Sequence, residues 1–374
     1  MRFSLSSSAL SSRLLSLSRV INNKNSLPIL SCFLFQVKDN VLTITASDSE
    51  NVMKTTIELS EHDGDGEFAV QSQTILDAVK ELPEQPLTLN VNLDEHVIYL
   101  TYQNGSYHFP VQSAEEYPRE QEMGEDASKF ALDAQVLSSA ISRSLFAAAQ
   151  DELRPVMNGI YINLAPGALT FVGTDAHKLV KYESEAENEV GASFILPKKP
   201  ANLLKSVLLK EDDAIEMSFD SKNALFKLKS HTLVCRLIEG NYPNYNAVIP
   251  SNNPNKVLVD RIELVNGIKR VAVCSNPTTN LIRMDIGDNR INLTAQDIDF
   301  SVSANETISC SYDGEEITIG FKSTFLVEIL SNMDTPTVVI ELADSTRAGV
   351  FKPVYDDKQT SSTLMLLMPM MINA

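Results

Sequence analysis

The amino-acid sequence predicts an α+β protein made of three similar domains, each with two helices packed on antiparallel sheets. Two observations predict this class. Three sequence blocks recur with offsets of 122 to 127 residues, and self-similarity at a fixed period indicates repeated structural units. Within each repeat, short alternating runs typical of strands accompany two segments whose apolar residues follow helical spacing.

Each repeat opens with a short strand followed by a helix. The three copies of this block are FSLSSSALSSRLLSLSRVI from Phe3, FALDAQVLSSAISRSLFAA from Phe130 and VLVDRIELVNGIKRVAVCS from Val257. Ser6, Asp133 and Asp260 lie at equivalent positions before the helical stretch and are residue types that cap helix N-termini. Apolar residues at helical spacing follow each cap, so we expect a helix with one buried face.

A run of strands follows the first helix. In the first repeat the alternation of apolar and polar residues predicts strands at 32–37, 41–46, 52–58, 67–70, 87–92, 96–102 and 107–112. Turn signals such as Asp39-Asn40 and Asn104-Gly105 separate them. One strand that ends in an aspartate recurs as LTITASD from Leu42, LTFVGTD from Leu169 and INLTAQD from Ile291.

A strand and a second helix recur later in each repeat. The copies read FAVQSQTILDAV from Phe68, FILPKKPANLL from Phe194 and IGFKSTFLVEI from Ile319. Proline-bearing connectors, EEYPRE around Pro118 and GNYPNYN around Pro243, end the first two repeats. We therefore expect domains at residues 1–125, 126–253 and 254–374.

Composition restricts the class of protein. Apolar residues make up 43% of the chain, and we find no apolar run long enough to cross a membrane. The four cysteines form no CxxC pair and the five histidines form no ligand cluster, which favours reduced thiols in a cytoplasmic protein and argues against a metal or another cofactor. The Ser-rich first 25 residues imitate a transit peptide, but their counterparts inside the chain indicate folded structure.

The distribution of charge qualifies the net charge of −18, which alone argues against nucleic-acid binding. The predicted helices carry many cations, namely Arg13, Arg19, Lys80, Arg143, Lys198, Lys199, Lys205, Lys210, Arg261, Lys269, Arg270 and Lys322. Their acids are fewer: Asp77, Glu81, Glu263 and Glu328. If the helices share one surface, that surface can hold a phosphate backbone without reading bases. The alternative is that helix surfaces simply favour long charged side chains.

Four stretches resemble a known family when taken with the repeat. They are NKNSLPIL at 23–30, GTDAHKL at 173–179, NYPNYNAVIP at 241–250 and LLMPM at 366–370. In order and spacing they are similar to the beta sliding clamp of bacterial DNA polymerase III, and the likeness covers the whole chain. The resemblance implies DNA-clamp domains, a head-to-tail homodimeric ring around double-stranded DNA, and tethering of the replicative polymerase, the clamp loader and repair proteins without sequence specificity.

The resemblance also implies where DNA and the second subunit bind. Residues at the family's DNA contacts are Lys24, Gln150, Lys198 and Lys199, and we expect both neighbouring lysines to face solvent. Pro155 and Val156 stand where the family often has an aromatic pair, so stacking on DNA is not expected there. The dimer contact implied by resemblance joins Phe109 and Val111, on an edge strand of the first domain, to Val273 and Cys274 at the end of a helix in the third domain. The alternative is that Phe109 and Val111 are interior strand residues.

A hydrophobic cleft that takes short linear peptides from partner proteins is the second implied site. By resemblance it comprises Met157, Thr174, Ala176, His177, Lys178, Leu179, Pro243, Val248, Thr346, Ala348, Leu366, Met368, Pro369 and Met370. The methionine-rich end of the chain suits a groove for varied partners, although it is equally consistent with a strand that ends the last domain. Ala176, Lys178, Ala247 and Met371 depart from the residues common in relatives, and a different peptide preference is the expected consequence.

Catalysis is not expected. The sequence has no GxSxG, Walker, GxGxxG, HExxH or EF-hand pattern. The aspartates Asp48, Asp175 and Asp297 are equivalent across the repeats, which favours turn formation over catalysis. The alternative function is an acidic scaffold of repeated domains that binds proteins and does not encircle DNA.

Overall fold

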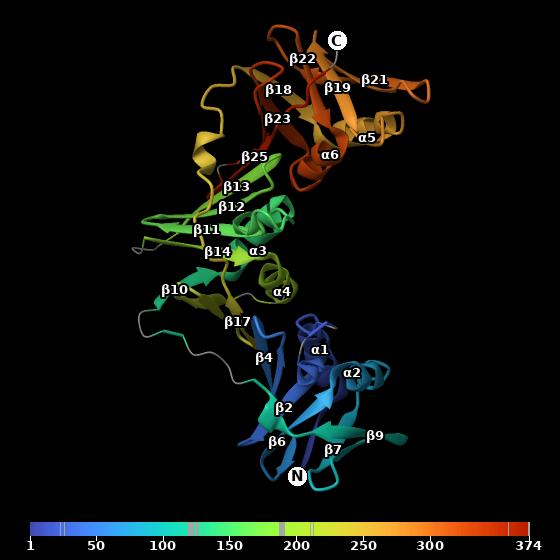
Figure 1. Cartoon of the computed structure of the whole chain (residues 1–374), viewed down its shortest axis with the longest axis vertical. Helices are drawn as coiled ribbons and strands as arrows, with labels where there is room; N and C mark the ends of the chain where they lie inside the picture. The colour runs from blue at the N-terminus through green and yellow to red at the C-terminus, as the bar shows by residue number, and fades with distance from the viewer. Residues whose placement is uncertain are drawn as a thin grey trace. The chain divides into compact units, whose positions relative to one another are not determined.

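The computed structural model describes residues 1–374 except 23, 26, 119–122, 125–126, 187–190, 210, 212, 358 and 373–374. Lys210 and the expected boundary near residue 125 fall on or beside this undescribed set. The chain forms two compact units, which we call the N-terminal unit (Met1–Ser138 with Lys199–Glu239) and the C-terminal unit (Ser139–Lys198 with Gly240–Ala374). Each unit is built on one continuous antiparallel sheet (Figure 1).

The N-terminal unit contains a sheet of 13 strands. In spatial order these are β10 (Ser128–Asp133), β15 (Ala214–Phe219), β16 (Asn223–Lys227), β17 (His231–Arg236), β4 (Asn51–Glu58), β3 (Val41–Ser47), β2 (Cys32–Lys38), β6 (Gly66–Gln71), β9 (Gly105–Gln112), β8 (Val97–Tyr102), β7 (Pro86–Asn92), β1 (Arg2–Ser6) and β5 (Glu61–Asp63). The seven strands expected in the first repeat are confirmed within about two residues. The short strand β5 was not predicted, because its EHD sequence has no apolar alternation.

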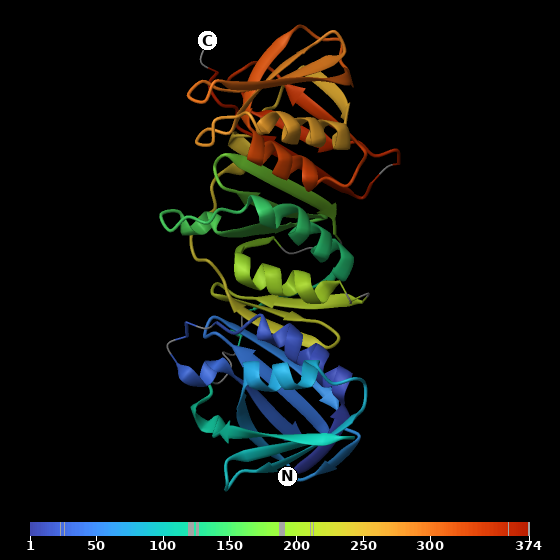
Figure 2. The ribbon, with the colours of Figure 1, turned by 90° about the vertical axis from the view of Figure 1, so that its right-hand side faces the viewer.

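The helices of the N-terminal unit bury one face each. They are α1 (Ser7–Ser18), α2 (Ser72–Lys80) and all but the first residue of α4 (Lys198–Leu208). Ser6 caps α1, because its side chain accepts a hydrogen bond from the N–H of Ala9 at 3.1 Å. Leu10, Leu14 and Leu17 are fully buried. Figure 2 shows α1 and α2 side by side against the strands, and the two helices are in contact.

The C-terminal unit contains a sheet of 12 strands. In spatial order these are β14 (Ala192–Pro197), β11 (Gly159–Ala165), β12 (Ala168–Thr174), β13 (Lys178–Glu185), β25 (Ser361–Leu367), β24 (Gly349–Pro353), β23 (Thr337–Leu342), β18 (Asn255–Asp260), β21 (Val302–Ser311), β20 (Arg290–Asp297), β19 (Leu281–Gly287) and β22 (Ile317–Lys322). Its helices α5 (Arg261–Ala272) and α6 (Ser323–Ser331) also lie side by side (Figure 2). Asp260 caps α5 by accepting the N–H of Glu263 at 2.7 Å, as predicted.

Helix α3 (Ala134–Ser144) belongs to the middle repeat and passes from one unit into the other. The Asp133 carboxylate accepts the N–H of Val136 at 3.0 Å, so the third predicted cap is also present. Short 3₁₀ turns lie at Pro28–Ser31 (η1), Ala114–Glu116 (η2), Leu145–Ala147 (η3), Pro155–Met157 (η4) and Tyr245–Ala247 (η5). None of the described helices is long and apolar enough to span a bilayer. The middle repeat therefore supplies strands to both sheets.

Candidate functional site

The turn between β12 and β13 holds the GTDAHKL residues in a fixed geometry. Asp175 accepts the N–H groups of His177 at 2.9 Å and Lys178 at 2.8 Å. The Thr174 hydroxyl donates to the carbonyl of Lys178 at 2.7 Å. Ala176 has a φ of 73°, a conformation that costs most residues about 1–2 kcal/mol. The turn is thus fixed by its own side chains.

Lys178 is buried at 5% exposure. Its Nζ lies 2.7 Å from Asp175 and 3.1 Å from Glu328, and 4.4 Å from the ring centroid of Phe325. Burial alone raises the pKa of Asp175, but the hydrogen bonds from Lys178 and His177 outweigh it and lower that pKa below its ordinary value. Lys178 therefore fixes the turn against α6.

His177 and the end of β25 complete this edge. The exposed His177 ring stacks on Phe325 with centroids 5.9 Å apart. Its carbonyl accepts the N–H of Met368 at 2.9 Å. Strand β25 pairs with β13 from Leu367 opposite Lys178 to Ser361 opposite Ser184. The turn and the end of the chain are consequently one continuous surface.

Beneath this surface lies a small apolar cluster of Val172, Leu179, Ala348 and Leu366, all buried. Partly buried side chains pack against it: Tyr161, Tyr242, Tyr245, Ile249 and Leu364. We call these nine residues the tyrosine cluster. The rings of Tyr161 and Tyr242 stack at 4.9 Å, and burial raises the pKa of the Tyr242 hydroxyl, which donates to the carbonyl of Val172. The cluster offers an aromatic and aliphatic floor.

The end of the chain is both a strand and an exposed tail. Leu366 and Leu367 are buried ladder residues, whereas Met368 is 42% and Met371 is 83% exposed. The N–H of Met370 donates to the carbonyl of Gly320 at 2.8 Å. A Cβ on Gly320 would lie 2.9 Å from the Met370 carbonyl oxygen, so glycine permits this approach. The strand interpretation of the tail is therefore confirmed up to Leu367, and the role of the exposed residues beyond it stays a prediction.

The remaining residues of the expected cleft are more scattered. Pro243 and Val248 are exposed on the connector, and Thr346 is exposed where its hydroxyl donates to Asp344 at 2.7 Å. Met157 is buried at the end of η4. Among the described residues, none of these four belongs to the tyrosine cluster.

Several residues of this surface were not predicted. They are Tyr161, Tyr242, Tyr245, Ile249 and Phe325. The two connector tyrosines could have been found from the pattern YPNY, in which aromatic residues flank a proline. Phe325 gave no signal, because it is an ordinary apolar residue of a helix.

The expected DNA contacts differ in exposure. Lys24 and Gln150 are exposed. Lys198 and Lys199 were expected to face solvent, and they do so only in part, because both are half-buried and hydrogen-bonded. The Lys198 Nζ donates to the carbonyls of Ala148 and Ala149 at 3.1 and 3.4 Å, and its desolvation lowers its pKa.

Lys199 is held within the N-terminal unit. Its Nζ donates to the carbonyl of Val20 at 2.6 Å and to Asp48 at 2.5 Å. Its charge is therefore largely compensated inside the protein, and it acts as a structural link as well as a cation.

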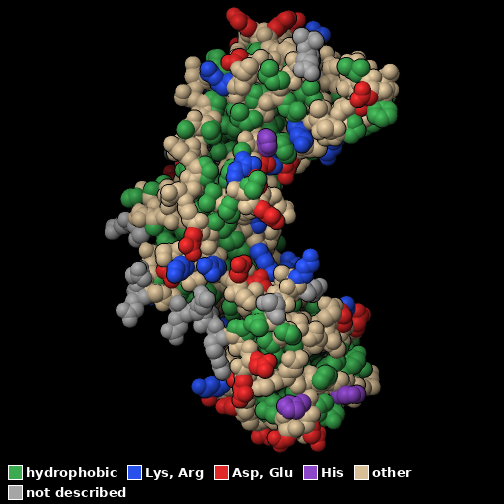
Figure 3. Space-filling view, viewed as in Figure 1, with side chains coloured by type: hydrophobic (Ala, Val, Ile, Leu, Met, Phe, Trp, Pro, Cys, Tyr) green, Lys and Arg blue, Asp and Glu red, His purple; other side chains and the backbone are tan. Residues whose placement is uncertain are grey.

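Ion pairs reduce the positive charge of the helices. Lys80 pairs with Asp77, Arg143 with Asp334 and Arg270 with Glu306. Among the described residues, no carboxylate forms an ion pair with Arg19, Lys205 or Lys269. Figure 3 shows Lys and Arg side chains gathered near α1 and α4, while acidic side chains gather at the far end of the N-terminal unit. The helices thus keep some cations free for an external anion.

The expected dimer residues lie in two kinds of environment. Phe109 and Val111 are 7% and 4% exposed, and Val273 is 82% exposed. Strand β9 was expected at an edge, but the sheet order has it between β6 and β8. Its pairing with β6 is nevertheless limited to Val111 and Gln112. The segment 105–110 pairs on one side alone, with β8.

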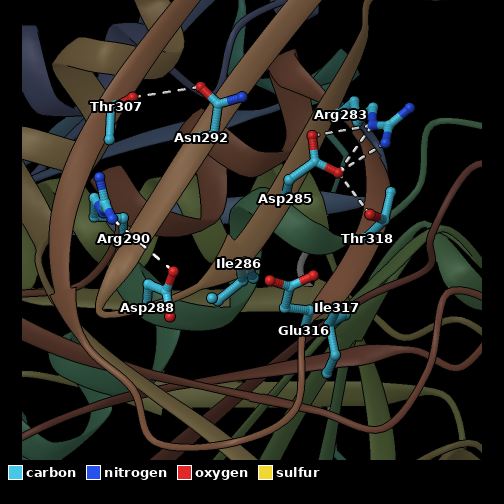
Figure 4. A pocket seen from close by; sticks show the side chains of 11 residues that line it. Arg283, Asp285, Ile286, Asp288, Arg290, Asn292, Thr307, Glu316, Ile317 and Thr318 are labelled. Carbon is cyan, nitrogen blue, oxygen red and sulfur yellow. Dashed lines mark hydrogen bonds and ion pairs between the residues drawn. The ribbon is translucent and has the colours of Figure 1, made fainter.

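Hollows lie elsewhere in the described residues. One, of about 440 Å³ in the C-terminal unit, is lined by side chains that interact with one another: Arg283 pairs with Asp285, and the Thr318 hydroxyl donates to Asp285 (Figure 4). Another, of about 700 Å³ in the N-terminal unit, contains Ser16 hydrogen-bonded to His231 at 2.9 Å. Among the described residues, no cluster of His, Cys, Asp or Glu could hold a metal ion.

Comparisons with known proteins agree along the whole chain. Models of the DNA polymerase III beta subunit match residues 1–121 (N-terminal domain), 131–244 (central domain) and 246–370 (C-terminal domain). The beta sliding clamp of Haemophilus influenzae is 27% identical, covering 99% of this chain and 100% of the relative. That of Pseudomonas putida is 26% identical, covering 96% and 97%.

Solved structures have the same fold. A DnaN sliding clamp from Pseudomonas aeruginosa bound to griselimycin matches with a TM-score of 0.94 at 24% identity. The DNA polymerase III beta subunit of Thermotoga maritima matches with a TM-score of 0.91 at 26% identity. Both comparisons cover 100% of each chain.

Proposed function

The chain belongs to the DNA polymerase III beta subunit family, and from this membership we propose how its residues perform the work of a sliding clamp. The subunit is non-catalytic and keeps a DNA polymerase on its template. The observation that carries the proposal is how the sheets of successive repeats join. The same kind of joint could form once more, between a strand of the third repeat and a strand of the first repeat of a second chain.

The two joints follow one rule. In the N-terminal unit, β4 of the first repeat pairs antiparallel with β17, the last strand of the second repeat. In the C-terminal unit, β13 of the second repeat pairs antiparallel with β25, the last strand of the third repeat. The strand after the aspartate turn of one repeat thus joins the last strand of the next repeat.

Applied to the third repeat, this rule would join β21 to β9, the last strand of the first repeat. Strand β21 pairs with β20 along its length but with β18 only through Ser311 and Cys310, so most of one edge is free, as in β9. Free edges add strands readily. We propose that β21 of one chain pairs with β9 of a second chain, and that two such head-to-tail contacts close a ring.

Enclosure then retains the DNA. A protein that encircles a duplex needs no tight grip, and contacts to phosphate do not select a sequence. Lys24 and Gln150, both exposed, are the better candidates for direct contact. Lys198 and Lys199 have a structural role instead, because their hydrogen bonds hold α4 to neighbouring segments.

The surface over the tyrosine cluster is the proposed site for peptides of the polymerase, the clamp loader and repair proteins. An apolar side chain can pack on Tyr161, Tyr242 and Leu366, while the flexible Met368 adjusts to different partners. His177 and the buried Lys178 form its rim. We expect the protein to act in the cytoplasm, where the DNA is replicated.

The experiment that tests ring closure compares two templates. Loaded onto nicked circular duplex DNA, the protein should remain bound, and it should run off once a restriction enzyme linearises the circle. A scaffold that does not encircle DNA, the alternative function, should show no dependence on DNA ends. Equal retention on both templates would contradict the enclosure mechanism.

A further inference from the structure

The hollow of about 700 Å³ in the N-terminal unit has no part in either proposed partner surface. It is lined by one face of α1, by the paired ends of β3 and β4, by the last turns of α4 and by the turn between β16 and β17. All of these elements belong to the same compact unit. Its volume lies in the range of roughly 300–1,000 Å³ that is usual for sites of small molecules, so it is large enough for an organic ligand.

A chain of hydrogen bonds between α1 and the β16–β17 turn fixes part of this lining. The Ser16 hydroxyl donates to the carbonyl of Arg13 at 2.8 Å, so it accepts from Nε2 of the buried His231 at 2.9 Å. Ser230 accepts Nη1 of Arg13 at 2.8 Å and lies 3.0 Å from Nδ1 of His231. A neutral imidazole with its proton on Nε2 satisfies every member of the chain. Ser230 and His231 therefore hold the guanidinium in place.

Arg13 keeps most of its hydrogen-bond donors for a ligand. It is half-buried. Among the described residues, its side chain donates to Ser230 alone and pairs with no carboxylate. A guanidinium has several N–H donors in a planar fork that matches the oxygens of a phosphate or a carboxylate. The free part of this fork can therefore bind an anionic group.

A buried carboxylate lines the same hollow. Glu211 is 5% exposed, and its Oε2 accepts the N–H of Lys229 at 3.2 Å. Within the described part of the chain, no cation forms an ion pair with it, and this includes Arg13. A buried charge without a partner is costly. A ligand that brings an anionic group to Arg13 and an N–H donor to Glu211 would compensate both.

The charges of the lining favour a small ligand over DNA. Two cations and two carboxylates line the hollow, namely Arg13, Lys229, Glu58 and Glu211. With His231 neutral there is no excess of positive charge, which a long polyanion such as DNA would need. The other lining residues supply hydroxyl groups and small apolar surfaces: Ser12, Ser16, Thr56, Ser206 and Ser230, with Ala9, Val41, Ile57 and Val207.

We propose that this hollow binds a small phosphate ester that also carries an amino group, with the phosphate on Arg13 and the amino group on Glu211. A nucleoside monophosphate with an exocyclic amine has this chemistry. The hydroxyl groups of the lining suit its ribose and phosphate oxygens, and the apolar side chains suit the face of its base. The proposal does not depend on the ring.

A series of three ligands tests the two contacts by isothermal titration calorimetry on the full chain. Adenosine monophosphate should bind. Inosine monophosphate, which has a carbonyl oxygen in place of the amine, should bind about tenfold more weakly, because it loses one hydrogen bond to a charged group. Adenosine, which lacks the phosphate, should also bind about tenfold more weakly for the same reason.

Two variants assign these preferences to residues. Arg13→Gln should remove the preference for adenosine monophosphate over adenosine, and Glu211→Gln should remove the preference over inosine monophosphate. Both substitutions keep the side chain similar in length, and circular dichroism checks that the variants fold. Arg19→Gln is the matched control, because it removes an exposed cation at the end of the same helix, outside the hollow. It should keep both preferences.

Three results would overturn the proposal. The first is no binding of adenosine monophosphate to the natural protein at millimolar concentration, which needs no variant. The second is a preference that stays unchanged in the variant meant to remove it. The third is displacement of adenosine monophosphate by a duplex oligonucleotide, which would assign the hollow to the DNA backbone.

Discussion

Lys178 is a buried cation held by two carboxylates and an aromatic ring. Removing one partner from a buried ion pair is costly, because the remaining charge cannot return to water. At the scale of single residues, the proposed partner surface thus depends on a buried charge that fixes the β12–β13 turn against α6.

Asp175→Asn should lower the free energy of unfolding by about 2 kcal/mol at neutral pH, because Glu328 alone remains to compensate Lys178. The pKa of Asp175 is lowered in the folded protein, so its contribution is fully present above roughly pH 4, near the unfolded value, and is lost as pH falls through the folded value. Urea unfolding of both proteins between pH 3 and pH 7 measures this. A constant difference across that range would contradict it.

Ala176→Gly should stabilise the protein by up to about 1 kcal/mol. Glycine accepts the φ of 73° without strain, and this gain exceeds the extra backbone entropy lost on folding. Ala78→Gly, in the middle of α2, is the control and should destabilise by roughly 1 kcal/mol. Thermal unfolding distinguishes them, and destabilisation by both variants would show that the turn is not strained.

Two elements are proposed to meet a partner: the free segment of β9 and the tail after β25. The pairing register of β9 with β8 shows which way each backbone N–H of β9 points. Because the N–H of Val111 donates to the carbonyl of His96, alternate residues such as His108 direct their N–H away from β8. At the scale of elements, binding therefore depends on the backbone as much as on side chains.

His108→Pro removes one outward donor while leaving the ladder with β8 intact, and proline is tolerated on such edges. It should weaken dimerisation at least severalfold. His108→Ala, which keeps the N–H, is the matched control and should have a much smaller effect. Equal affinities for the two variants, measured by sedimentation, would remove β9 from the interface.

Deleting residues 368–374 should abolish binding of polymerase-derived peptides and leave the dimer unchanged. Strand β25 ends at Leu367, so its ladder with β13 survives the deletion. Peptide affinity by fluorescence anisotropy and the mass in solution give the two readouts. Unchanged peptide affinity would exclude the tail from the site.

At the scale of the whole molecule, one joint is used repeatedly. The β4–β17 and β13–β25 pairs are built by the chain itself, and the proposed third joint would pair β21 with β9 of a second copy. Repetition of a single contact is how identical units generate closed symmetric assemblies.

The mass in solution should accordingly be that of two chains at micromolar concentration. Multi-angle light scattering after gel filtration measures it. A single-chain mass for the natural protein at that concentration would contradict the ring.

The sequence by itself determined the repeat, the helix caps at Ser6, Asp133 and Asp260, and most strand bounds, because these depend on local spacing and capping chemistry. It also identified the family, through motifs whose order spans the chain. Domain boundaries and the roles of the cleft residues stay predictions.

Only the tertiary structure decided that Lys178 is buried, that Lys198 and Lys199 are tied to carbonyls, and that Phe325 supports His177. It also decided that β9 lies between β6 and β8 in the sheet, while its segment 105–110 pairs with β8 alone and has a free edge on the other side. The physical reason is that local spacing fixes which way a side chain or strand edge points. The partner that compensates a charge can lie far along the chain, as Glu328 does for Lys178 and Asp48 for Lys199.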